Sequence, residues 1–149
     1  MYMFSVCISI PRNEKEEDQW SYVLSHWQPS LLYLIGPGIV PYGNNVFKQG
    51  VQIDSTASLP KDQPLILLAP LLGRYIQGTE LIIDFIHPVN AIYMFGPNNL
   101  NLELDSDILQ GRSPDHIVYI PVDTHDEMYS WTAAVVTLYD RSAKEAISG

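Results

Sequence analysis

Short apolar runs recur along this chain, and most are closed by proline, glycine or asparagine. Runs of this kind, rich in Val, Ile, Leu, Tyr and Phe, predict buried strands. They show little alternation of apolar and polar positions, as expected when both faces of a sheet are covered. The predicted strands are Phe4–Ile10, Leu31–Ile35, Val51–Ile53, Leu65–Ala69, Ala91–Phe95 and Ile117–Ile120.

Apolar residues at steps of three and four lie between several of these runs and predict helices. The first helix follows an acidic cluster that suits a helix N-terminus, and Pro29 ends it. Its apolar face consists of Trp20, Val23, Leu24 and Trp27. A second helix is predicted over Glu80–Ile86, with His87 as its C-terminal cap and Pro88 after it.

The last predicted helix begins near Thr124, because Thr124 and Glu127 have the spacing of a capping box. Arg141 and Lys144 are expected near its C-terminal end, where they suit the helix dipole. Its apolar face consists of Met128, Trp131, Val135 and Leu138.

Strands and helices therefore alternate along the whole chain. This order predicts a single α/β domain over residues 1–149, with a mostly parallel sheet and helices on both of its faces. We find no internal repeat, no low-complexity tract and no internal domain boundary.

The amino-acid composition and the net charge limit the classes of function that the chain can have. The formal charge is −9 and the pI is about 4.6, so the chain lacks the overall positive charge typical of a nucleic-acid-binding protein. Cys7 is the only cysteine, which excludes a disulfide or a cysteine zinc site within the chain and favours a core position. No apolar run approaches the ~20 residues that span a bilayer, and the first run lacks a basic start. A cytoplasmic protein is expected.

Two motifs follow the last predicted strands. The first, Phe95–Leu102, reads F-G-P-N-N-L-N-L. The second begins with Ile120-Pro121-Val122 and continues with Glu127-Met128-Tyr129. It ends with the predicted helix, whose last motif residues are Leu138-Tyr139-Asp140. In this order they resemble the motifs F-G-P-E-x-x-G-L and I-P-M…S-(L/M)-N…L-Y-E of the SPOUT superfamily. The chain is most similar to its small single-domain tRNA ribose 2'-O-methyltransferases, and the resemblance covers nearly all of its length.

The resemblance implies a C-terminal trefoil knot and a homodimer with the last helix in its interface. It also implies S-adenosylmethionine as the methyl donor, held largely by the backbone of the loops after the last strands. Trp131, Val135 and Leu138 could contact the second subunit or face the protein's own sheet. The residues then expected at the donor are Ala69, Phe95, Gly96, Pro97, Asn98, Ile120, Pro121, Met128 and Tyr129.

The chain departs from the family where the chemistry is expected. The family's first motif, N-x-G-x-x-x-R, places Asn13 on its asparagine, Lys15 on its glycine and Gln19 on the arginine that is thought to activate the ribose hydroxyl. Glutamine cannot act as a fixed cation, so Arg12 or Lys15 is the candidate replacement. The glutamate of the second motif is Asn98. Glu127 and Tyr129 replace the serine and asparagine of the third.

Two functions follow. The first is an S-adenosylmethionine-dependent RNA methyltransferase, acting on a ribose 2'-hydroxyl of tRNA or rRNA. The second is a catalytically degenerate protein of the same fold, which binds S-adenosylmethionine or a related nucleoside, or serves as a dimeric protein-interaction module. No metal site is expected, since His125-Asp126-Glu127 has no second ligand cluster and reads as a cap and a solvated loop.

Overall fold

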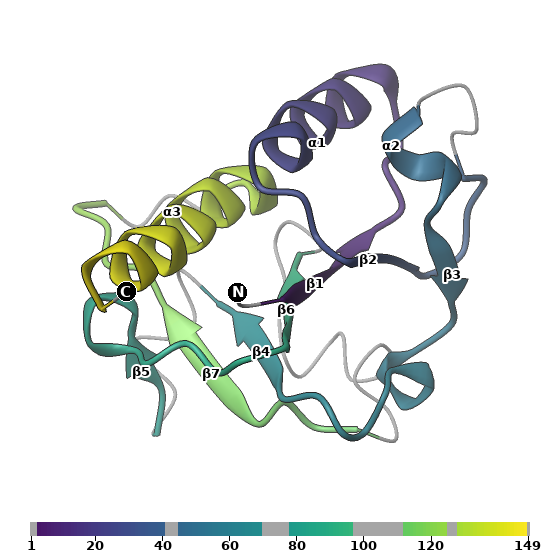
Figure 1. Cartoon of the computed structure of the whole chain (residues 1–149). Coiled ribbons are helices and arrows are strands. Elements are labelled where there is room, and N and C mark those ends of the chain that lie inside the picture. The colour runs from purple at the N-terminus through teal and green to yellow at the C-terminus, as the bar shows by residue number, and fades with distance from the viewer. Residues whose placement is uncertain (1–2, 41–44, 70–77, 97–111, 125–127, 149) are drawn as a thin grey trace.

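The computed structural model describes residues 3–40, 45–69, 78–96, 112–124 and 128–148. Its strands form one seven-stranded sheet, with helices packed against it (Figure 1). The strands are β1 (Phe4–Ser9), β2 (Leu31–Ile35), β3 (Val51–Ile53), β4 (Leu65–Leu68), β5 (Glu80–Leu81), β6 (Ala91–Phe95) and β7 (His116–Tyr119). The helices are α1 (Glu14–His26), α2 (Asn45–Lys48) and α3 (Ser130–Ser148), with 3₁₀ turns η1 (Thr56–Ser58) and η3 (Ile82–Asp84).

The strand order is β3-β2-β1-β6-β4-β7-β5, and every pair is parallel. The prediction of a mostly parallel sheet is therefore confirmed. The central strands β6 and β4 are buried along their whole lengths, which explains why their sequences are continuously apolar. All the predicted strands form, with shifts of one residue at the ends of β1, β4 and β7.

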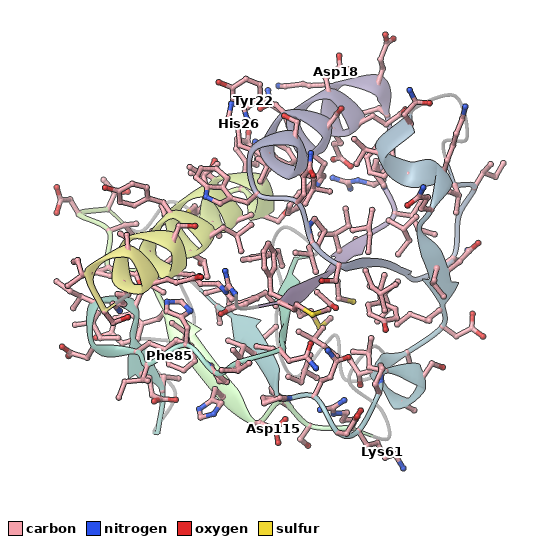
Figure 2. All side chains as sticks on the ribbon, viewed as in Figure 1. Asp18, Tyr22, His26, Lys61, Phe85 and Asp115 are labelled. Carbon is pink, nitrogen blue, oxygen red and sulfur yellow. The ribbon has the colours of Figure 1, made fainter. Side chains whose placement is uncertain are left out.

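The main core lies between one face of the sheet and the helices. α1 contributes Trp20, Val23 and Leu24, and α3 contributes the small residues Ala133 and Ala134, which let it approach the strands closely. Trp20 packs against Phe95 with ring centroids 6.1 Å apart. On the outer side of α1, Asp18, Tyr22 and His26 project away from the sheet (Figure 2).

The second face of the sheet carries a smaller cluster that includes Cys7, Tyr33, Leu67 and Met94. Helices were expected on both faces. Within the described residues, α1, α2 and α3 contribute to the main core, whereas the smaller cluster joins strand residues to Leu59, which follows the 3₁₀ turn η1. Cys7 is fully buried, and this burial raises the pKa of its thiol to about 12, in agreement with a core position.

The predicted helix over Glu80–Ile86 is wrong. Glu80 and Leu81 instead form β5, which pairs with β7, and a single 3₁₀ turn follows. The segment is too short and too rich in β-branched residues to form a stable helix, so pairing at the sheet edge prevails. His87 is consequently no helix cap. Its ring lies between Tyr93 and Asp140.

The last helix begins at Ser130, not near Thr124. Thr124 lies in a bend, so the capping-box spacing there was coincidental, and Met128 precedes the helix. The helix also continues to Ser148, which leaves Arg141 and Lys144 before its last turn. Arg141 is buried over the Phe4 ring at 4.6 Å, and Lys144 bonds the carbonyls of Ile82 and Phe85.

No helix in the described part of the chain is long and apolar enough to cross a membrane. The trefoil knot stays a prediction, because the segments that join β4 to β5 and β6 to β7 lie partly outside the described residues.

Candidate functional site

Three neighbouring strands end together at the carboxyl edge of the sheet. Leu68 of β4 is in register with Phe95 of β6 and with Val118 of β7. The Ala69 amide, just beyond β4, donates to the Val118 carbonyl at 2.9 Å. Because parallel strands expose their ligand-binding loops at this edge, the ends of β4, β6 and β7 form the first candidate site.

The turn after β6 requires a glycine. Gly96 is buried and has φ of +85°, a left-handed conformation that residues with a Cβ rarely adopt. The Phe95 side chain is 1% exposed and belongs to the main core. Of Phe95 and Gly96, therefore, the backbone groups are the ones that could contact a ligand at this edge.

The segment after β7 borders the same edge. Ile120 is buried and Met128 is half-buried, and both contact the main core. Pro121 is exposed. Tyr129 is also exposed and stacks on Trp131, with ring centroids 4.8 Å apart. Ala69, which was also predicted at the donor, is buried at the end of β4.

Two predicted site residues, Pro97 and Asn98 of the second motif, lie outside the described residues. The segment His125-Asp126-Glu127, expected to be a cap and a solvated loop, also lies outside them. Their predicted roles are therefore untested by the structure.

A small cavity of about 90 Å³ lies beside the end of β1, between the first turn of α1 and the start of α3. It is lined by Ser9, Ile10, Arg12, Glu16, Trp20, Ser130 and Trp131. The ends of β1 and β6 are neighbours in the sheet, since Ile8 is in register with Phe95. The cavity and the Gly96 turn thus lie at the same edge.

Arg12 is held in place by Glu16. The guanidinium Nη2 donates to Glu16 Oε2 at 2.9 Å, and the Arg12 amide donates to Glu16 Oε1 at 2.9 Å. The Glu16 side chain is 13% exposed, whereas that of Arg12 is 75% exposed. Burial alone would raise the pKa of Glu16, but the bonds from Arg12 outweigh it and the pKa is lowered. The pair in turn raises the pKa of Arg12.

The three residues proposed for catalysis have different positions. Arg12 lines the cavity. Asn13 is the N-cap of α1, and its Oδ1 accepts from the Glu16 amide at 3.0 Å. Lys15 is exposed on the first turn of α1 and does not line the cavity. Arg12 is therefore the only one of the three whose side chain can act there.

Sequence reasoning missed Glu16 as a functional residue. It assigned the acidic cluster to the helix dipole, although Arg12 and Glu16 are four residues apart across a helix start, a spacing that favours an ion pair. Ser9 and Ser130, which also line the cavity, carry no signal in the sequence.

Together, these features place an exposed cation, paired with Glu16, at the same sheet edge as the backbone of Gly96. Backbone N–H and C=O groups at a strand end can bind a planar, uncharged heterocycle by its edge. The cation can stabilise negative charge on an adjacent oxygen. The arrangement therefore suits chemistry on an anionic or hydroxyl-bearing substrate.

No protein-family model matches the sequence, and no curated protein matches it. Solved structures do match its fold. A probable methylase family protein from Haemophilus influenzae Rd KW20 superposes with a TM-score of 0.74 at 13% identity, over 97% of this chain and 65% of that one. The SpoU methyltransferase AviRb from Streptomyces viridochromogenes, in complex with AdoMet, gives 0.70 at 15% identity, over 100% of this chain and 60% of that one.

A third match is a protein studied for 2-OH methylation of C/U34 on tRNA, with a TM-score of 0.66 and 16% identity, over 100% of this chain and 93% of that one. The chain thus spans less than two thirds of the first two proteins and nearly all of the third. The likeness shows that this chain has the α/β fold of these proteins. The α/β fold that the resemblance implied is therefore confirmed.

Proposed function

We propose that this chain is an S-adenosylmethionine-dependent RNA methyltransferase that acts on a ribose 2'-hydroxyl of tRNA or rRNA. The observation that carries the proposal is the position of Arg12, an exposed cation fixed by Glu16 at the same sheet edge as the Gly96 turn. The fold adds support, because AviRb has it and was solved with AdoMet.

The described residues of the edge fit the donor. Ala69, Phe95, Gly96 and Ile120 carry no charged side chain, and Gly96 opens the backbone where a Cβ would stand. An adenosine group can be bound there by backbone N–H and C=O groups, with Ile120 and Met128 as apolar neighbours. The proposal also assigns donor binding to Pro121 and Tyr129 and, outside the described residues, to Pro97 and Asn98.

When bound, S-adenosylmethionine supplies an electrophilic methyl group on a sulfonium. The protein must then orient the acceptor hydroxyl and stabilise the charge that develops on its oxygen. Arg12 is suited to this task, because its guanidinium stays protonated and Glu16 limits its rotamers. Glu16 itself is a weak base, since its pKa is lowered, and we assign it the role of positioning Arg12.

We also propose a homodimer. Leu138 is buried in the chain's own core, and Trp131 packs against that core. Val135 and Tyr139 are exposed on α3, which contacts α1, and Tyr22 is exposed on α1. These apolar side chains on neighbouring helices suit a two-fold contact between identical subunits.

The second candidate function is donor binding without methyl transfer. Its support is the acidity of the chain, with a net charge of −9, and the carboxylate of Glu16 next to Arg12. RNA would then meet little attraction at the site.

The test is transfer of a tritiated methyl group from S-adenosylmethionine to bulk tRNA and rRNA, followed by nuclease digestion to identify 2'-O-methylated nucleotides. We expect transfer that Arg12→Ala abolishes and Lys15→Ala leaves unchanged. Donor binding with no transfer to any RNA would favour the second candidate. Transfer that is unaffected by Arg12→Ala would contradict the role given to Arg12.

A further inference from the structure

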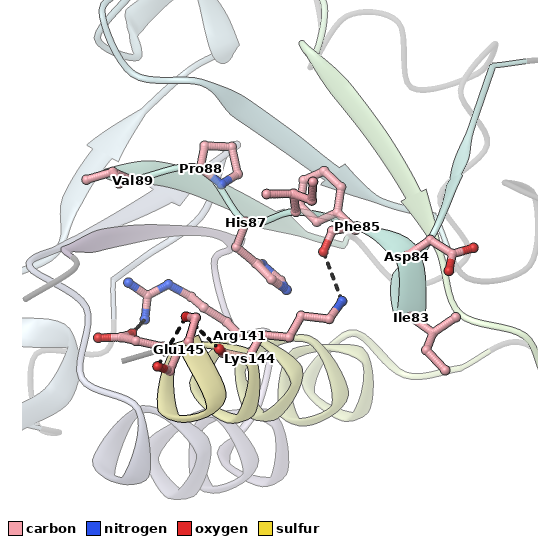
Figure 3. Close-up of a pocket in the computed structure, with 11 residues that line it drawn as sticks. Ile83, Asp84, Phe85, His87, Pro88, Val89, Arg141, Lys144 and Glu145 are labelled. Carbon is pink, nitrogen blue, oxygen red and sulfur yellow. Dashed lines mark hydrogen bonds and ion pairs between the residues drawn. The ribbon is translucent and has the colours of Figure 1, made fainter.

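A second, larger cavity of about 480 Å³ opens at the amino edge of the sheet (Figure 3). One wall is the segment 83–89, which leads into β6, and the other is the last part of α3. The Gly96 turn lies at the opposite end of β6. The cavity has the volume of a typical ligand site and is separate from the proposed donor pocket.

The rim of this cavity is apolar and exposed. Ile83, Ile86 and Val89 have exposed fractions of 68%, 87% and 59%. Single exposed apolar side chains are ordinary, but several around one cavity are typical of an interaction site.

The walls of the cavity are held by side-chain bonds. Lys144 donates to the carbonyls of Ile82 at 2.8 Å and Phe85 at 2.9 Å, and it pairs with Asp140 at 2.8 Å. His87 Nε2 lies 2.7 Å from the same carboxylate. These bonds fix segment 83–89 on α3, so the cavity is preformed.

These contacts also leave the two cationic side chains of the cavity, Lys144 and Arg141, already bound to partners. Lys144 has the three acceptors just described, and Arg141 is 7% exposed, stacked over Phe4, with Nη1 3.4 Å from Glu145. By contrast, Asp84 is exposed and has no ion-pair partner among the described residues. The last turn of α3 contains no basic residue to offset the negative end of the helix dipole. The mouth of the cavity therefore attracts positive charge.

We propose that this cavity docks a basic amphipathic segment of another protein. An apolar side chain of the partner enters between Ile83, Ile86 and Val89, while Lys or Arg residues beside it face Asp84 and the end of α3. A second copy of this chain fits poorly in a two-fold contact here, because its Lys144 and Arg141 are already engaged and leave no cation for Asp84. A basic partner would also supply the positive charge that a chain with a net charge of −9 lacks.

The first test titrates three fluorescein-labelled helical peptides of equal length with the full chain and follows fluorescence anisotropy. One peptide has a Leu face and a Lys face, the second has Glu in place of Lys, and the third has Ser in place of Leu. We expect the Leu–Lys peptide to bind with a micromolar dissociation constant and the other two to bind at least about tenfold more weakly. Equal binding of the three peptides, or no binding of the first, would overturn the proposal.

Matched variants locate the binding. Ile86→Asp and Asp84→Lys should each weaken binding of the Leu–Lys peptide about tenfold. The controls are Ile39→Asp, whose side chain is as exposed as that of Ile86, and Asp18→Lys on α1; both should bind like the wild type.

Two further results would contradict the proposal. The first is Ile86→Asp binding the Leu–Lys peptide as the wild type does. The second is Ile86→Asp converting a dimer to a monomer in light scattering, because the cavity would then be an interface between copies of this chain. Binding of S-adenosylmethionine should be unchanged in Ile86→Asp, which separates this test from that of the proposed methyl transfer.

Discussion

The two edges of the sheet are organised differently. At the carboxyl edge, the ends of β4, β6 and β7 are joined by backbone bonds such as that from Ala69 to Val118, and the turn depends on the backbone of Gly96. At the amino edge, the connection between segment 82–89 and α3 depends on ionisable side chains, with Asp140 accepting from both His87 and Lys144.

This difference determines which of the two edges tolerates substitution of its side chains. A backbone-lined site tolerates most side-chain substitutions, so the candidate donor site is compatible with 13–16% identity to proteins of the same fold. A side-chain network does not have this tolerance, because the loss of one partner leaves the others buried without a bond. Mutations at the amino edge should therefore have the larger effect on stability. Mutations at the carboxyl edge should have the larger effect on ligand binding.

The largest stability effect is expected at Asp140. Asp140→Ala removes the acceptor of His87 Nε2 and of Lys144 Nζ in a partly buried network, so unfolding in urea should require about 3 kcal/mol less free energy. Asp62→Ala, at an exposed turn, serves as the control and should change stability by less than about 0.5 kcal/mol. Equal effects of the two substitutions would contradict the claim that side-chain bonds at the amino edge stabilise the protein.

The next largest effect is expected from Gly→Ala substitutions at two glycines that have similar backbone conformations. Gly96 has φ of +85° and Gly78, just before β5, has φ of +88°. Either Gly→Ala substitution should destabilise the protein by about 1–2 kcal/mol, because alanine is strained there. Only Gly96→Ala should weaken S-adenosylmethionine binding, by at least about tenfold in calorimetry. If Gly78→Ala weakens binding to the same extent, the loss reports general stability and not the site.

A smaller effect on stability distinguishes the structural role of Asn13 from the catalytic role proposed for Arg12. Asn13→Ala removes the N-cap of α1 and should lower stability by about 1 kcal/mol, whereas Asn13→Ser should largely restore it. Methyl transfer by folded Asn13→Ser should match that of the wild type. A loss of transfer in this stable variant would return Asn13 to the list of catalytic candidates.

The smallest effect concerns pH. Burial is the main reason that the pKa of His87 lies below its usual value, although Asp140 opposes the shift. A lowered folded-state pKa stabilises the protein above the unfolded value, about 6.5, and this contribution is lost as the pH falls below it. The melting temperature should therefore fall between about pH 7.5 and pH 5.5, and fall less in His87→Gln. An identical fall in both proteins would exclude His87 as its source.

The sequence predicted the strands well, because runs such as Leu31–Ile35 and Ala91–Phe95 are apolar throughout and end at turn residues. It failed where distant contacts decide local structure. Glu80 and Leu81 form a strand because β7 offers an edge, and Lys144, 62 residues away, bonds the Ile82 carbonyl. The strand order of the sheet is likewise not encoded in any local pattern.

The same reasoning applies to the sites. Arg12 was identified because it immediately precedes Asn13, the first residue of the motif that follows the first strand. The His87–Asp140 contact joins residues 53 positions apart. Asp140 ends the third motif, but no pattern in the sequence links it to His87. The cavity at the amino edge was therefore invisible in the sequence, although its exposed isoleucines are part of the segment that was mistaken for a helix.

The central claim is that the carboxyl edge binds S-adenosylmethionine. Calorimetric titration of the purified chain with S-adenosylmethionine and with S-adenosylhomocysteine tests it most directly. We predict one site per chain and a dissociation constant of about 1–50 μM for both ligands. Binding should be at least about tenfold weaker in Gly96→Ala and unchanged in Gly78→Ala. An absence of heat at about 1 mM of either ligand would contradict the claim and leave the chain with the fold alone.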